Sequence, residues 1–505
     1  MHLSLLLDMA ADGFGDRVVI GPCSTGLTAS RLRTLSHAAA RAIRSRNADS
    51  VLYLGVNGPS FAIAMFGAAL AGVPLVPVNY RLGREQMDHL LAQHPAAYGI
   101  ASTQDEVDAL WRNGIGATAP EALLDEPAET EAGDVELAAG DAPAVIIYTS
   151  GTTSAPKAVL LRHENLVSYV LGTVEFACAG EEEAALMSVP PYHIAAVANV
   201  LTNLYAGRRT LMLQQFSPVE WMGVVRSEGV TNAMVVPTML ARILQEPSLS
   251  PLPSLRTLAY GGAPMPGKVI ERALMLWPNV DFVNAYGLTE TSSTISILGP
   301  DEHRAALLSD DPAVRARLSS AGQVLPTIEL EIRDIAGAVL GAGEAGRIWV
   351  RGDQVSAEDG GLGKALDSNG FFDTRDEGYL DSEGFLFIGG RSDDTIIRGG
   401  ENIAPAEIEE VLLRHEAVAD VVVIGVADEE WGHRIEAAVV LHEGTSVTEE
   451  ELRHQVRVAL RGSKTPDRIV FWTEIPRTET GKLVRRQAVE RLAQALSSAA
   501  GAKGK

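Results

Sequence analysis

Short apolar runs alternate with longer apolar or amphipathic segments along the first two-thirds of the chain. Residues 51–56 have the pattern of a buried strand, 61–71 that of a buried helix, and 73–78 that of a second strand. Further strands are predicted at 145–148, 158–161, 232–236 and 281–285. Strands that alternate with helices are typical of α/β domains with much parallel sheet, so this class is predicted here.

The last third of the chain has a different pattern of apolar and polar positions. Strands are predicted at 328–332 and 347–350, joined by a glycine-rich turn. From Asp393 onwards the pattern predicts a compact unit with helices at 405–414 and 449–461 and strands at 421–425 and 436–441. The chain is therefore expected to fold as a large N-terminal unit followed by a smaller C-terminal one.

Composition narrows the class of protein. The 505-residue chain is 46% hydrophobic and 21% charged, near the average for globular proteins. Its formal net charge of −23 argues against a nucleic-acid surface, which needs clustered positive charge, although a local pocket can still bind a small anion. The two cysteines, Cys23 and Cys178, do not suggest a disulfide framework, which fits a reducing compartment. Both are predicted to be small, buried hydrophobic side chains.

Neither a targeting segment nor a membrane span is predicted. Residues 3–7 are apolar but too few for a signal peptide, and no basic residue precedes them. Residues 61–78 carry no charge, but Pro74 and Pro77 interrupt them, so a buried helix and a buried strand are predicted. We expect a cytoplasmic protein without nucleic-acid partners. The oligomeric state stays open, with a homodimer as one option.

The segment Tyr148-Thr-Ser-Gly-Thr-Thr-Ser-Ala-Pro-Lys157 carries the strongest local chemical signal. It combines hydroxyls, a glycine and a lysine, and a polyphosphate requires hydroxyl and backbone donors with a cation. The segment lacks the Gly-x-x-x-x-Gly-Lys-Ser/Thr spacing of a P-loop, and a strand pattern follows it instead of a helix. A strand–loop–strand phosphate site is therefore predicted, with an ordinary Ser/Thr-rich hairpin as the alternative.

Two other glycine-containing segments match nucleotide motifs only in part. Gly341-Ala-Gly-Glu-Ala-Gly346 has the letters of the dinucleotide fingerprint, but a strand pattern follows where the fingerprint needs a helix, so a hairpin turn is predicted. Gly481-Lys482 lacks the first glycine and the magnesium-binding hydroxyl of a Walker motif. Taken alone, Lys482 is an exposed lysine after a flexible glycine.

The order of the motifs is more specific than any one of them. The hydroxyl-rich loop is followed by Pro190-Pro-Tyr-His193, Gly261-Gly-Ala-Pro264, Tyr286-Gly-Leu-Thr-Glu290, Gly390-Arg-Ser-Asp393, Gly399-Gly-Glu-Asn402 and Gly481-Lys482. This order resembles the adenylate-forming superfamily of acyl- and aryl-CoA synthetases, peptide-synthetase adenylation domains and firefly-type luciferases. The resemblance covers essentially the whole chain and is closest in character to stand-alone bacterial acyl- or aryl-CoA ligases.

The resemblance implies an AMP-forming acid:CoA ligase. ATP and an aryl or short- to medium-chain acid would give an acyl-adenylate and pyrophosphate, and coenzyme A would then displace AMP. ATP, Mg²⁺ and coenzyme A are the implied cofactors and co-substrates. The implied fold has a large N-terminal domain of stacked mixed sheets and helices at 1–390, a hinge at 391–393, and a small mobile α+β domain at 394–505.

Nucleotide-binding residues carry over from the resemblance by position. The triphosphate would be held by Thr149, Ser150, Gly151, Thr152, Thr153 and Lys157. The adenine would be framed by Gly262, Ala263, Asn284, Ala285, Tyr286 and Gly287. Asp376 would bind the ribose hydroxyls, with Ile388 and Arg391 nearby. Thr289 would reach the α-phosphate, and Glu290 would bind Mg²⁺.

The resemblance also implies a moving catalytic cation. Lys482 would approach the α-phosphate and the attacking carboxylate oxygen and stabilise the transition state of adenylation. Asp393 matches the hinge position about which the C-terminal domain would rotate. That rotation would remove Lys482 and bring in the acceptor-side residues Gly399, Gly400, Glu401 and Asn402 for the second step.

The acid pocket is predicted from the same motifs. Its candidate lining residues are His193, Ile194, Ala195, Gly261, Gly287, Thr291 and Ser292. Small residues dominate this set, which suits an aromatic or medium-length acyl group without specifying one. His193 is expected to line the pocket and to control entry of the acceptor. No aspartate that could pair with an α-ammonium group stands near Val235 and Val236, which disfavours peptide-synthetase chemistry.

Three positions depart from the family pattern and keep other readings open. Ser154 and Ala158 stand where relatives usually have glycines, which stiffens the phosphate loop. Arg375 replaces the glycine that usually precedes the ribose aspartate. One alternative is adenylation with a non-CoA acceptor, giving an amide or activating nitrite to diazotise an aryl amine. Another is a catalytically inactive nucleotide-binding module, which the retained Lys482, Glu290, Asp376 and Lys157 disfavour.

Overall fold

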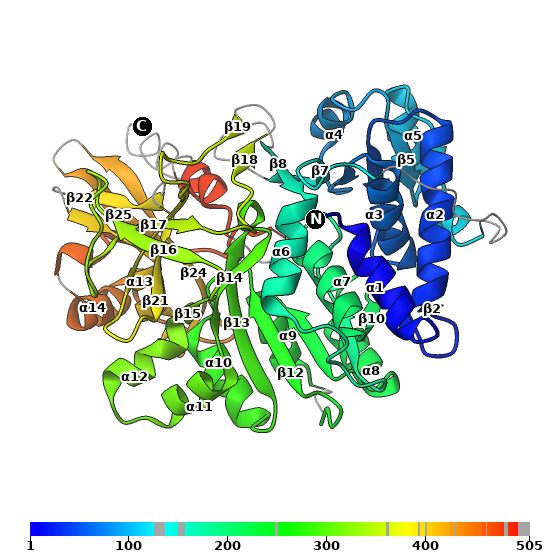
Figure 1. The fold of residues 1–505 in the computed structure, drawn as a ribbon. Coiled ribbons are helices and arrows are strands. Elements are labelled where there is room, and N and C mark those ends of the chain that lie inside the picture. The colour runs from blue at the N-terminus through cyan, green and yellow to red at the C-terminus, as the bar shows by residue number, and fades with distance from the viewer. Residues whose placement is uncertain are drawn as a thin grey trace.

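A computed structural model describes most of the chain. It covers residues 1–125, 137–149, 157–247, 251–359, 363–391, 394–398, 401–428, 431–460, 462–478 and 483–492. Figure 1 shows a large unit, coloured blue to yellow, and a smaller orange-to-red unit formed by the C-terminal part. The predicted α/β class, with a large N-terminal and a small C-terminal unit, is confirmed.

The first sheet of the large unit is mostly parallel. Within the described residues it has nine strands in the order β15-β14-β13-β12-β11-β9-β10-β1-β2. The strands from β1 through β10, β9, β11 and β12 to β13 are parallel neighbours, and β2, β14 and β15 add antiparallel edges. Their bounds are β1 (Val18–Ile20), β2 (Leu27–Thr28), β9 (Ala184–Met187), β10 (Arg209–Met212), β11 (Asn232–Val235), β12 (Thr257–Gly261), β13 (Asp281–Leu288), β14 (Ser293–Leu298) and β15 (Gln323–Val324).

Two further sheets complete the large unit. In the described part of the chain, the second sheet runs β19-β18-β8-β7-β4-β3-β5-β6 and the third runs β16-β17-β20-β21. The second contains β3 (Val51–Leu54), β4 (Leu75–Pro77), β5 (Tyr98–Ala101), β6 (Ala117–Thr118), β7 (Pro143–Thr149), β8 (Lys157–Arg162), β18 (Glu358–Asp359) and β19 (Gly363–Lys364). The third contains β16 (Glu329–Arg333), β17 (Gly346–Arg351), β20 (Phe372–Leu380) and β21 (Leu386–Arg391).

Helices cover the sheets of the large unit. They are α1 (Ser4–Phe14), α2 (Ala29–Ser45), α3 (Pro59–Ala71), α4 (Arg84–Leu91), α5 (Gln104–Arg112), α6 (His163–Thr173), α7 (Ile194–Ala206), α8 (Pro218–Ser227), α9 (Pro237–Gln245), α10 (Gly267–Leu276), α11 (Pro300–Leu308) and α12 (Pro312–Ala316), with single turns η1 (Pro120–Leu123), η2 (Thr289–Thr291) and η3 (Arg317–Ser319). Helix α3 is buried from Ser60 to Leu70. It begins with Pro59 and ends at Gly72 in the left-handed conformation, a common arrangement of helix ends.

The uncharged stretch at 61–78 is thus a buried helix followed by the buried strand β4, as predicted. Among the residues that the structure describes, no helix is both long and apolar enough to cross a membrane.

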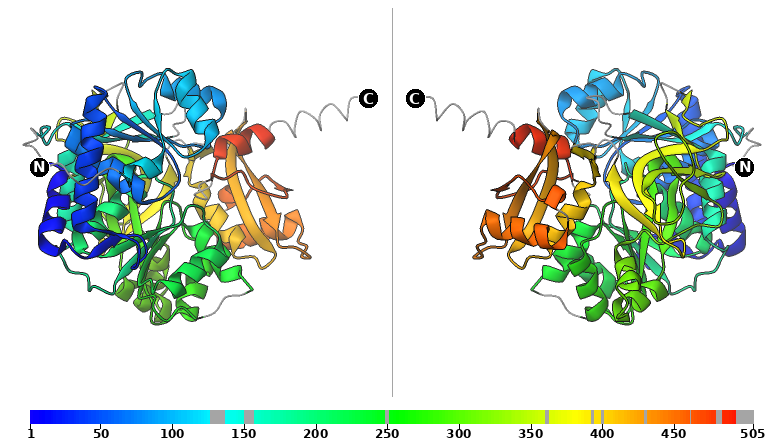
Figure 2. Two further views of the ribbon diagram at one scale, coloured as in Figure 1. Left: turned by 90° about the vertical axis from the view of Figure 1, so that its right-hand side faces the viewer. Right: turned by 90° about the vertical axis from the view of Figure 1, so that its left-hand side faces the viewer.

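The C-terminal unit has its own sheet and core. Its elements are β22 (Ile396–Arg398), β23 (Glu401–Ile403), α13 (Pro405–Leu413), β24 (Val418–Asp428), β25 (Gly432–Leu441), α14 (Glu449–Ala459), η5 (Gly462–Lys464) and β26 (Arg468–Phe471). Buried residues such as Ile408, Val423 and Val439 join the helices to one face of the sheet. Figure 2 shows this unit on one side of the large unit, and α13 contacts β21.

Most predicted elements are present, with boundaries shifted by a few residues. The glycine-rich segment at 341–346 joins β16 to β17, which pair antiparallel with Arg333 opposite Arg347. It is therefore a hairpin turn, as predicted, and not a dinucleotide-binding loop.

The prediction that both cysteines are buried is wrong. Cys23 and Cys178 are both exposed. Cys23 lies in a tight turn between β1 and β2, where the N–H of Gly26 donates to the carbonyl of Pro22 at 2.7 Å. Cys178 lies in the connection between α6 and β9. Each is on a surface turn, where the backbone path sets exposure and side-chain hydrophobicity has little influence.

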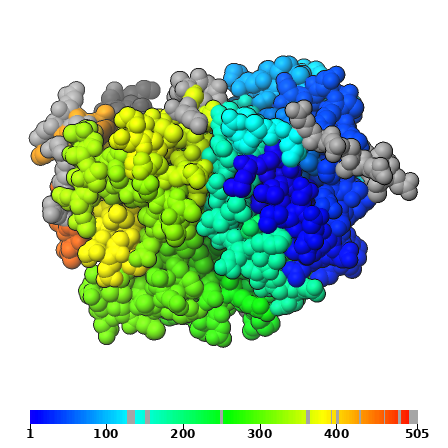
Figure 3. Space-filling view, viewed as in Figure 1, coloured from blue at the N-terminus to red at the C-terminus, as the bar shows by residue number. Residues whose placement is uncertain are grey.

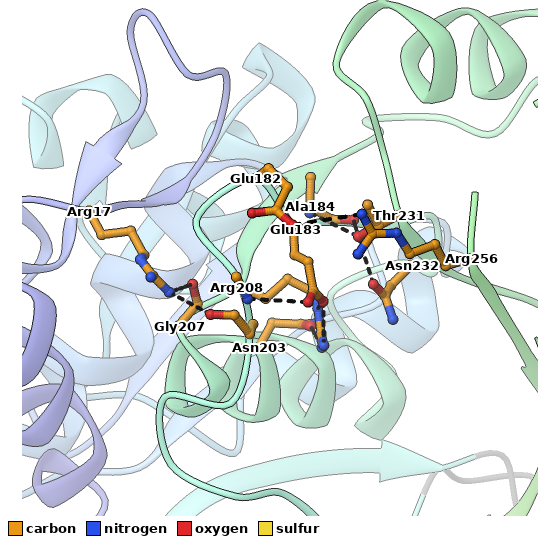
Figure 4. A network of polar contacts seen from close by, with 12 residues as sticks. Arg17, Glu182, Glu183, Ala184, Asn203, Gly207, Arg208, Thr231, Asn232 and Arg256 are labelled. Atoms are coloured by element: carbon orange, nitrogen blue, oxygen red, sulfur yellow. Dashed lines mark hydrogen bonds and ion pairs between the residues drawn. The ribbon is translucent and has the colours of Figure 1, made fainter. Parts of the chain in front are cut away.

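A network of polar contacts lies along the amino-terminal edge of the parallel sheet (Figure 4). Arg208 donates from Nε to the Glu183 carboxylate at 3.0 Å, and Arg256 lies 3.7 Å from Glu182. Arg17 donates to the carbonyls of Ala179 and Gly207, both at 2.9 Å. These charges lie at the edge of the sheet opposite the carboxyl ends of β12 and β13, and in α/β proteins ligands bind at the carboxyl edge.

Two stacked histidines join the start of the chain to α6: His2 precedes α1, and His163 is the first residue of α6. Helix α1 packs against α2, α3 and α7, and Figure 3 shows its outer face at the surface in dark blue. The rings of His2 and His163 stack with their centroids 3.9 Å apart, and the N–H of Leu3 donates to Nδ1 of His163 at 3.3 Å. Burial, with help from the neighbouring His2 and the N-terminal amine, lowers the pKa of His163 to about 3.

We expect acid to weaken the fold through this pair. The folded pKa of His163 lies below its unfolded value, so its contribution is fully present above the unfolded pKa of 6.5 and decreases as the pH falls below it. The loss of unfolding free energy between pH 6.5 and pH 5 should be about 2 kcal/mol. Urea unfolding at these pH values should show a smaller loss for His163→Phe, whereas the exposed His89→Gln should behave like the parent. A loss of unfolding free energy in His163→Phe as large as that of the parent would contradict this expectation.

Candidate active site

The predicted adenine and acid residues gather at the carboxyl ends of three strands of the first sheet, β9, β12 and β13. Gly261 ends β12, residues 284–288 end β13, and His193 follows β9 and precedes the first turn of α7. Strands β13, β12, β11 and β9 are adjacent in the sheet, so these segments share one edge. The carboxyl edge of an open parallel sheet is where α/β proteins bind their ligands.

Two glycines allow the strands at this edge to approach closely. A Cβ on Gly261 would lie 2.3 Å from the carbonyl oxygen of Ala285, and one on Gly287 would lie 1.8 Å from the carbonyl oxygen of Ser293. Any side chain at either position would force the backbone apart. Both glycines are therefore required by the packing of β12, β13 and β14, whatever ligand the edge binds.

Asp376 is the best-defined polar group of the site. It lies on β20 opposite Arg391 of β21, and Nε of Arg391 is 2.9 Å from its carboxylate. The hydroxyl of Tyr286 donates to the second carboxylate oxygen at 2.6 Å. The backbone N–H of Asp376 donates to Oγ1 of Thr374, which in turn donates to the carbonyl of Ile348. Tyr286, Asp376 and Arg391, all predicted to bind the nucleotide, thus meet at the Asp376 carboxylate although they are far apart in the sequence.

The protonation state of Tyr286 follows from its surroundings. Burial and then the Asp376 carboxylate raise the pKa of Tyr286 well above its usual value. The phenol therefore stays neutral and donates its proton to the carboxylate. The arrangement offers a fixed carboxylate as an acceptor for hydroxyl groups. Ile388, also predicted here, lies on β21 and packs beneath it in the core shared by the first and third sheets.

Glu290 lies on a tightly constrained turn. The turn η2 contains Thr289, Glu290 and Thr291, and Oγ1 of Thr291 accepts from the N–H of Leu288 at 3.0 Å. The backbone carbonyl of Glu290 accepts from the N–H groups of Ser356 at 2.9 Å and Ala357 at 3.1 Å. Within the described residues, the carboxylate of Glu290 has no hydrogen-bond or ion-pair partner. A carboxylate held by its backbone, with no partner for its oxygens among the described residues, fits a hard cation such as Mg²⁺.

Thr291 and Ser292, predicted to line the acid pocket, are both fully buried. The Thr291 hydroxyl donates to the carbonyl of Ser293 at 2.8 Å, and the Ser292 hydroxyl donates to the carbonyl of Gln354 at 2.8 Å. Their hydroxyls stabilise the turn itself, and a role in contacting the acid stays a prediction.

The hydroxyl-rich motif lies between two antiparallel strands, as predicted. Thr149 at the end of β7 is opposite Lys157 at the start of β8, so the two ends of the motif meet. Strand β8 packs against η2, which brings this hairpin to the turn that carries Glu290. Residues Ser150, Gly151, Thr152 and Thr153 lie outside the described residues, as does Ser154.

His193 lies at the other side of the carboxyl edge of the first sheet. Its ring lies 4.7 Å from that of Tyr192, which in turn packs edge-on against Tyr80 at 5.5 Å. Ile194 and Ala195 form the first turn of α7 and pack partly against the main core. The predicted acid-pocket segment is therefore a helix start at the same edge as Gly261.

Several predicted residues lie outside the part of the chain that the structure describes. They are Asp393 of the hinge, Gly399 and Gly400 of the acceptor side, and Lys482. For Glu401 and Asn402 the backbone alone is described, in β23, where Asn402 is opposite Ile397. The hinge at 391–393 and the domain limits stay predictions.

Sequence reasoning did not find the residues that link these parts. Residues 353–358 hydrogen-bond both to the Glu290 turn and to β8, and Thr395 donates to Glu377 beside Asp376 at 2.8 Å. No local motif marks them, because their partners are far away along the chain. Only the tertiary structure identifies them.

Arg375, the departure next to Asp376, has a strained backbone. Its φ is +60°, a left-handed conformation that a glycine adopts freely and other residues do not. Its N–H donates to Oδ1 of Asp373 at 2.9 Å, and its side chain is exposed. The structure thus keeps the conformation of a glycine at a position occupied by arginine.

We expect Arg375→Gly to stabilise the protein. Removing left-handed strain gains about 1–2 kcal/mol, and the greater freedom of glycine in the unfolded chain offsets about 0.4–1 kcal/mol of it. Urea unfolding should therefore show a net gain of about 0.5–1 kcal/mol. Arg375→Ala, which removes the cation and keeps the strain, should not show this gain. Equal stability of the two variants would contradict the explanation.

Comparisons with known proteins agree with this arrangement. The AMP-binding enzyme profile matches residues 7–358, and the profile of the AMP-binding enzyme C-terminal domain matches residues 407–482. The chain is 31% identical over 489 residues to the fatty acid–[acyl-carrier-protein] ligase ScoC of Streptomyces coeruleorubidus, covering 92% of this chain and 91% of that protein. It is 33% identical over 456 residues to a feruloyl-CoA synthase of an Amycolatopsis species, covering 88% and 89%.

A solved structure shows the same fold. The o-succinylbenzoate coenzyme A synthetase MenE of Bacillus subtilis, in complex with ATP and a magnesium ion, superposes with a TM-score of 0.82 at 29% identity, covering 95% of this chain and 98% of that one. The fold and the site together define an ATP-dependent, AMP-forming ligase of the adenylate-forming superfamily. The chain belongs to the AMP-binding enzyme family.

Proposed function

We propose that the protein activates a carboxylic acid as its acyl-adenylate and transfers the acyl group to coenzyme A. The observation that carries the proposal is the Asp376 cluster, in which Tyr286 and Arg391 hold a carboxylate near the carboxyl edge of the parallel sheet. A fixed carboxylate acceptor suits the paired hydroxyls of a ribose. Adenine would pack against the backbone of residues 262–263 and 284–287.

Each remaining group has a role in the first step. Thr149, Ser150, Gly151, Thr152, Thr153 and Lys157 would bind the triphosphate, and Thr289 would donate to the α-phosphate. Glu290 would hold Mg²⁺, which would offset the negative charge of the phosphates. Lys482 would donate to the α-phosphate and to the attacking carboxylate oxygen as the new bond forms. The acid would lie beside His193, Ile194 and Ala195.

The second step requires a rearrangement of the C-terminal unit. This unit has a separate core and is joined to β21 through the segment that contains Asp393, which supports rotation of the unit as a body. Rotation would withdraw Lys482 and bring residues 399–402 to the adenylate, so that a thiol can displace AMP. His193 would then control access of the thiol.

An ATP–pyrophosphate exchange screen tests the first step. The screen covers aryl, short-chain and medium-chain acids, with nitrite as an additional substrate. Exchange with one of these acids is expected, and its absence with all of them would contradict the proposal. The activating acid is then incubated with ATP and coenzyme A, and the thioester is sought by mass spectrometry.

The acceptor decides between related functions. The relatives named above include one fatty acid–[acyl-carrier-protein] ligase and one feruloyl-CoA synthase. Acid-dependent exchange without a coenzyme A thioester would favour a carrier protein or an amine as acceptor. Exchange with nitrite alone would favour diazotisation. ATP binding without exchange would favour an inactive nucleotide-binding module.

A further inference from the structure

A short segment connects the turn that carries Glu290 to β8 of the predicted triphosphate hairpin. This segment, residues 353–358, is here called the strap. The carbonyl of Asp353 accepts from Nδ2 of Asn165 at 2.8 Å, and the carboxylate of Glu358 forms two hydrogen bonds with Arg162 at 2.8 and 2.9 Å. Both ends of the strap are therefore fixed next to β8, one strand of the hairpin predicted to bind the triphosphate.

The middle of the strap holds the turn that carries Glu290. Gln354 is buried, and its Nε2 donates to the carbonyls of Thr291 at 3.0 Å and Thr294 at 2.8 Å. Its own carbonyl accepts from the Ser292 hydroxyl at 2.8 Å. Two residues further on, the N–H groups of Ser356 and Ala357 donate to the carbonyl of Glu290.

The backbone held in this way is strained. Ser292 has φ +56° and Ser293 has φ +114°, both outside the range that side chains other than glycine prefer. Such conformations persist where the surrounding contacts determine them, and they concentrate at functional sites. The amide of Gln354 bridges carbonyls on both sides of the strained pair, so together with the Thr291 and Ser292 hydroxyls it holds their conformation.

The strap also sets the position of the turn relative to the hairpin. The hydroxyl of Ser356 donates to the carbonyl of Leu160 on β8, and Asp359 of β18 is opposite Val159. Ser356 and Ala357 thus bind the backbone of Glu290 on one side, and Ser356 also binds β8 on the other. A shift of the strap would change the distance between the Glu290 carboxylate and the phosphate hairpin.

We infer that Gln354 is a positioning residue for the divalent cation that accompanies ATP. It holds the Glu290 turn against the strap and so places the carboxylate at a fixed distance from the phosphates bound by the β7–β8 hairpin. The inference rests on the proposed function for the role of Glu290. Residues that orient a metal ligand without touching the metal commonly change metal affinity by roughly 10- to 100-fold when replaced.

Calorimetric titrations test this inference with the full-length protein. ATP binding is measured at a series of Mg²⁺ concentrations, and AMP binding is measured without metal. In Gln354→Met, the Mg²⁺ concentration for half-maximal ATP binding should rise by roughly tenfold or more, while AMP binding stays at the parent value. Ser356→Ala, which removes one side-chain bond of the strap, should shift the Mg²⁺ requirement in the same direction by less.

A matched control separates positioning from general destabilisation. Gln455 donates from Nε2 to the carbonyl of Val411 at 2.7 Å in the C-terminal unit, so Gln455→Met loses a similar bond far from Glu290. It should leave the Mg²⁺ requirement unchanged. Thermal unfolding of all variants identifies any that do not fold. If Gln354→Met does not fold, Gln354→Leu replaces it.

The possible results distinguish this inference from the proposed function. An unchanged Mg²⁺ requirement in Gln354→Met, or an equal loss of AMP binding, would overturn the inference. Mg²⁺-independent binding of ATP by the parent would overturn both the role of Glu290 and the inference. Mg²⁺-dependent ATP binding without pyrophosphate exchange would overturn the proposed function alone, and the Gln354→Met comparison would still decide the inference.

Discussion

Replacing Lys482 by alanine is expected to reduce the rate of adenylation by about 10²- to 10³-fold, equivalent to about 2.7–4 kcal/mol of transition-state stabilisation. The reason is that the proposed cation acts where charge develops, between the α-phosphate and the attacking oxygen. Preorganised donors at such a point are commonly the largest single contribution to catalysis. ATP–pyrophosphate exchange with the activating acid measures the effect directly.

Two comparisons make the Lys482→Ala result specific. Lys268→Ala removes an exposed lysine of α10 and should exchange at the parent rate. Synthetic acyl-adenylate, supplied to Lys482→Ala with coenzyme A, should still give thioester, because the lysine is proposed to be withdrawn in that step. Exchange by Lys482→Ala at the parent rate would remove the basis for the proposed mechanism.

Asp376→Asn is expected to raise the KM for ATP by about 10- to 100-fold. The carboxylate is buried between Tyr286 and Arg391, and hydrogen bonds to a charged group are worth about 1.5–3 kcal/mol. The amide keeps the shape of the side chain but loses the charge that would accept from two ribose hydroxyls. Steady-state kinetics, together with direct titration of AMP, measures the change.

Structural damage must be separated from lost nucleotide contacts in Asp376→Asn. Glu329→Gln removes one partner of the exposed Arg351–Glu329 pair at the edge of the same sheet and should leave the KM for ATP unchanged. Tyr286→Phe keeps the carboxylate and should weaken AMP binding less than Asp376→Asn. A lowered melting temperature in Asp376→Asn with an unchanged KM for ATP would assign the cluster a structural role only.

Predictions from local patterns succeeded where the physical cause is local. The apolar, uncharged run at 61–71 is a buried helix because a segment without polar side chains is stable only in the interior. The segment at 341–346 is a turn because the strand pattern after it excludes a helix. The predicted burial of Cys23 and Cys178 was wrong because exposure depends on the path of a turn, which side-chain hydrophobicity does not determine.

The candidate site was predictable as a set of positions but not as an arrangement. Tyr286, Asp376 and Arg391 each belong to a recognisable motif, yet the hydrogen bond between Tyr286 and Asp376 joins residues 90 positions apart. The strain at Arg375 could be suspected from the missing glycine, but its φ shows that the backbone kept the glycine conformation.

The sequence by itself determined the class of the protein, the order of its elements and the identity of most candidate site residues, because periodicity and motif spacing act over a few residues at a time. Only the tertiary structure decided which groups meet: Gln354 with the Glu290 turn, Ser356 with β8, and Asp376 with Tyr286. These contacts depend on how whole sheets pack. A buried amide such as Gln354 carries no local signal of the carbonyls that it will satisfy, since burial leaves it no water and the fold alone supplies its partners.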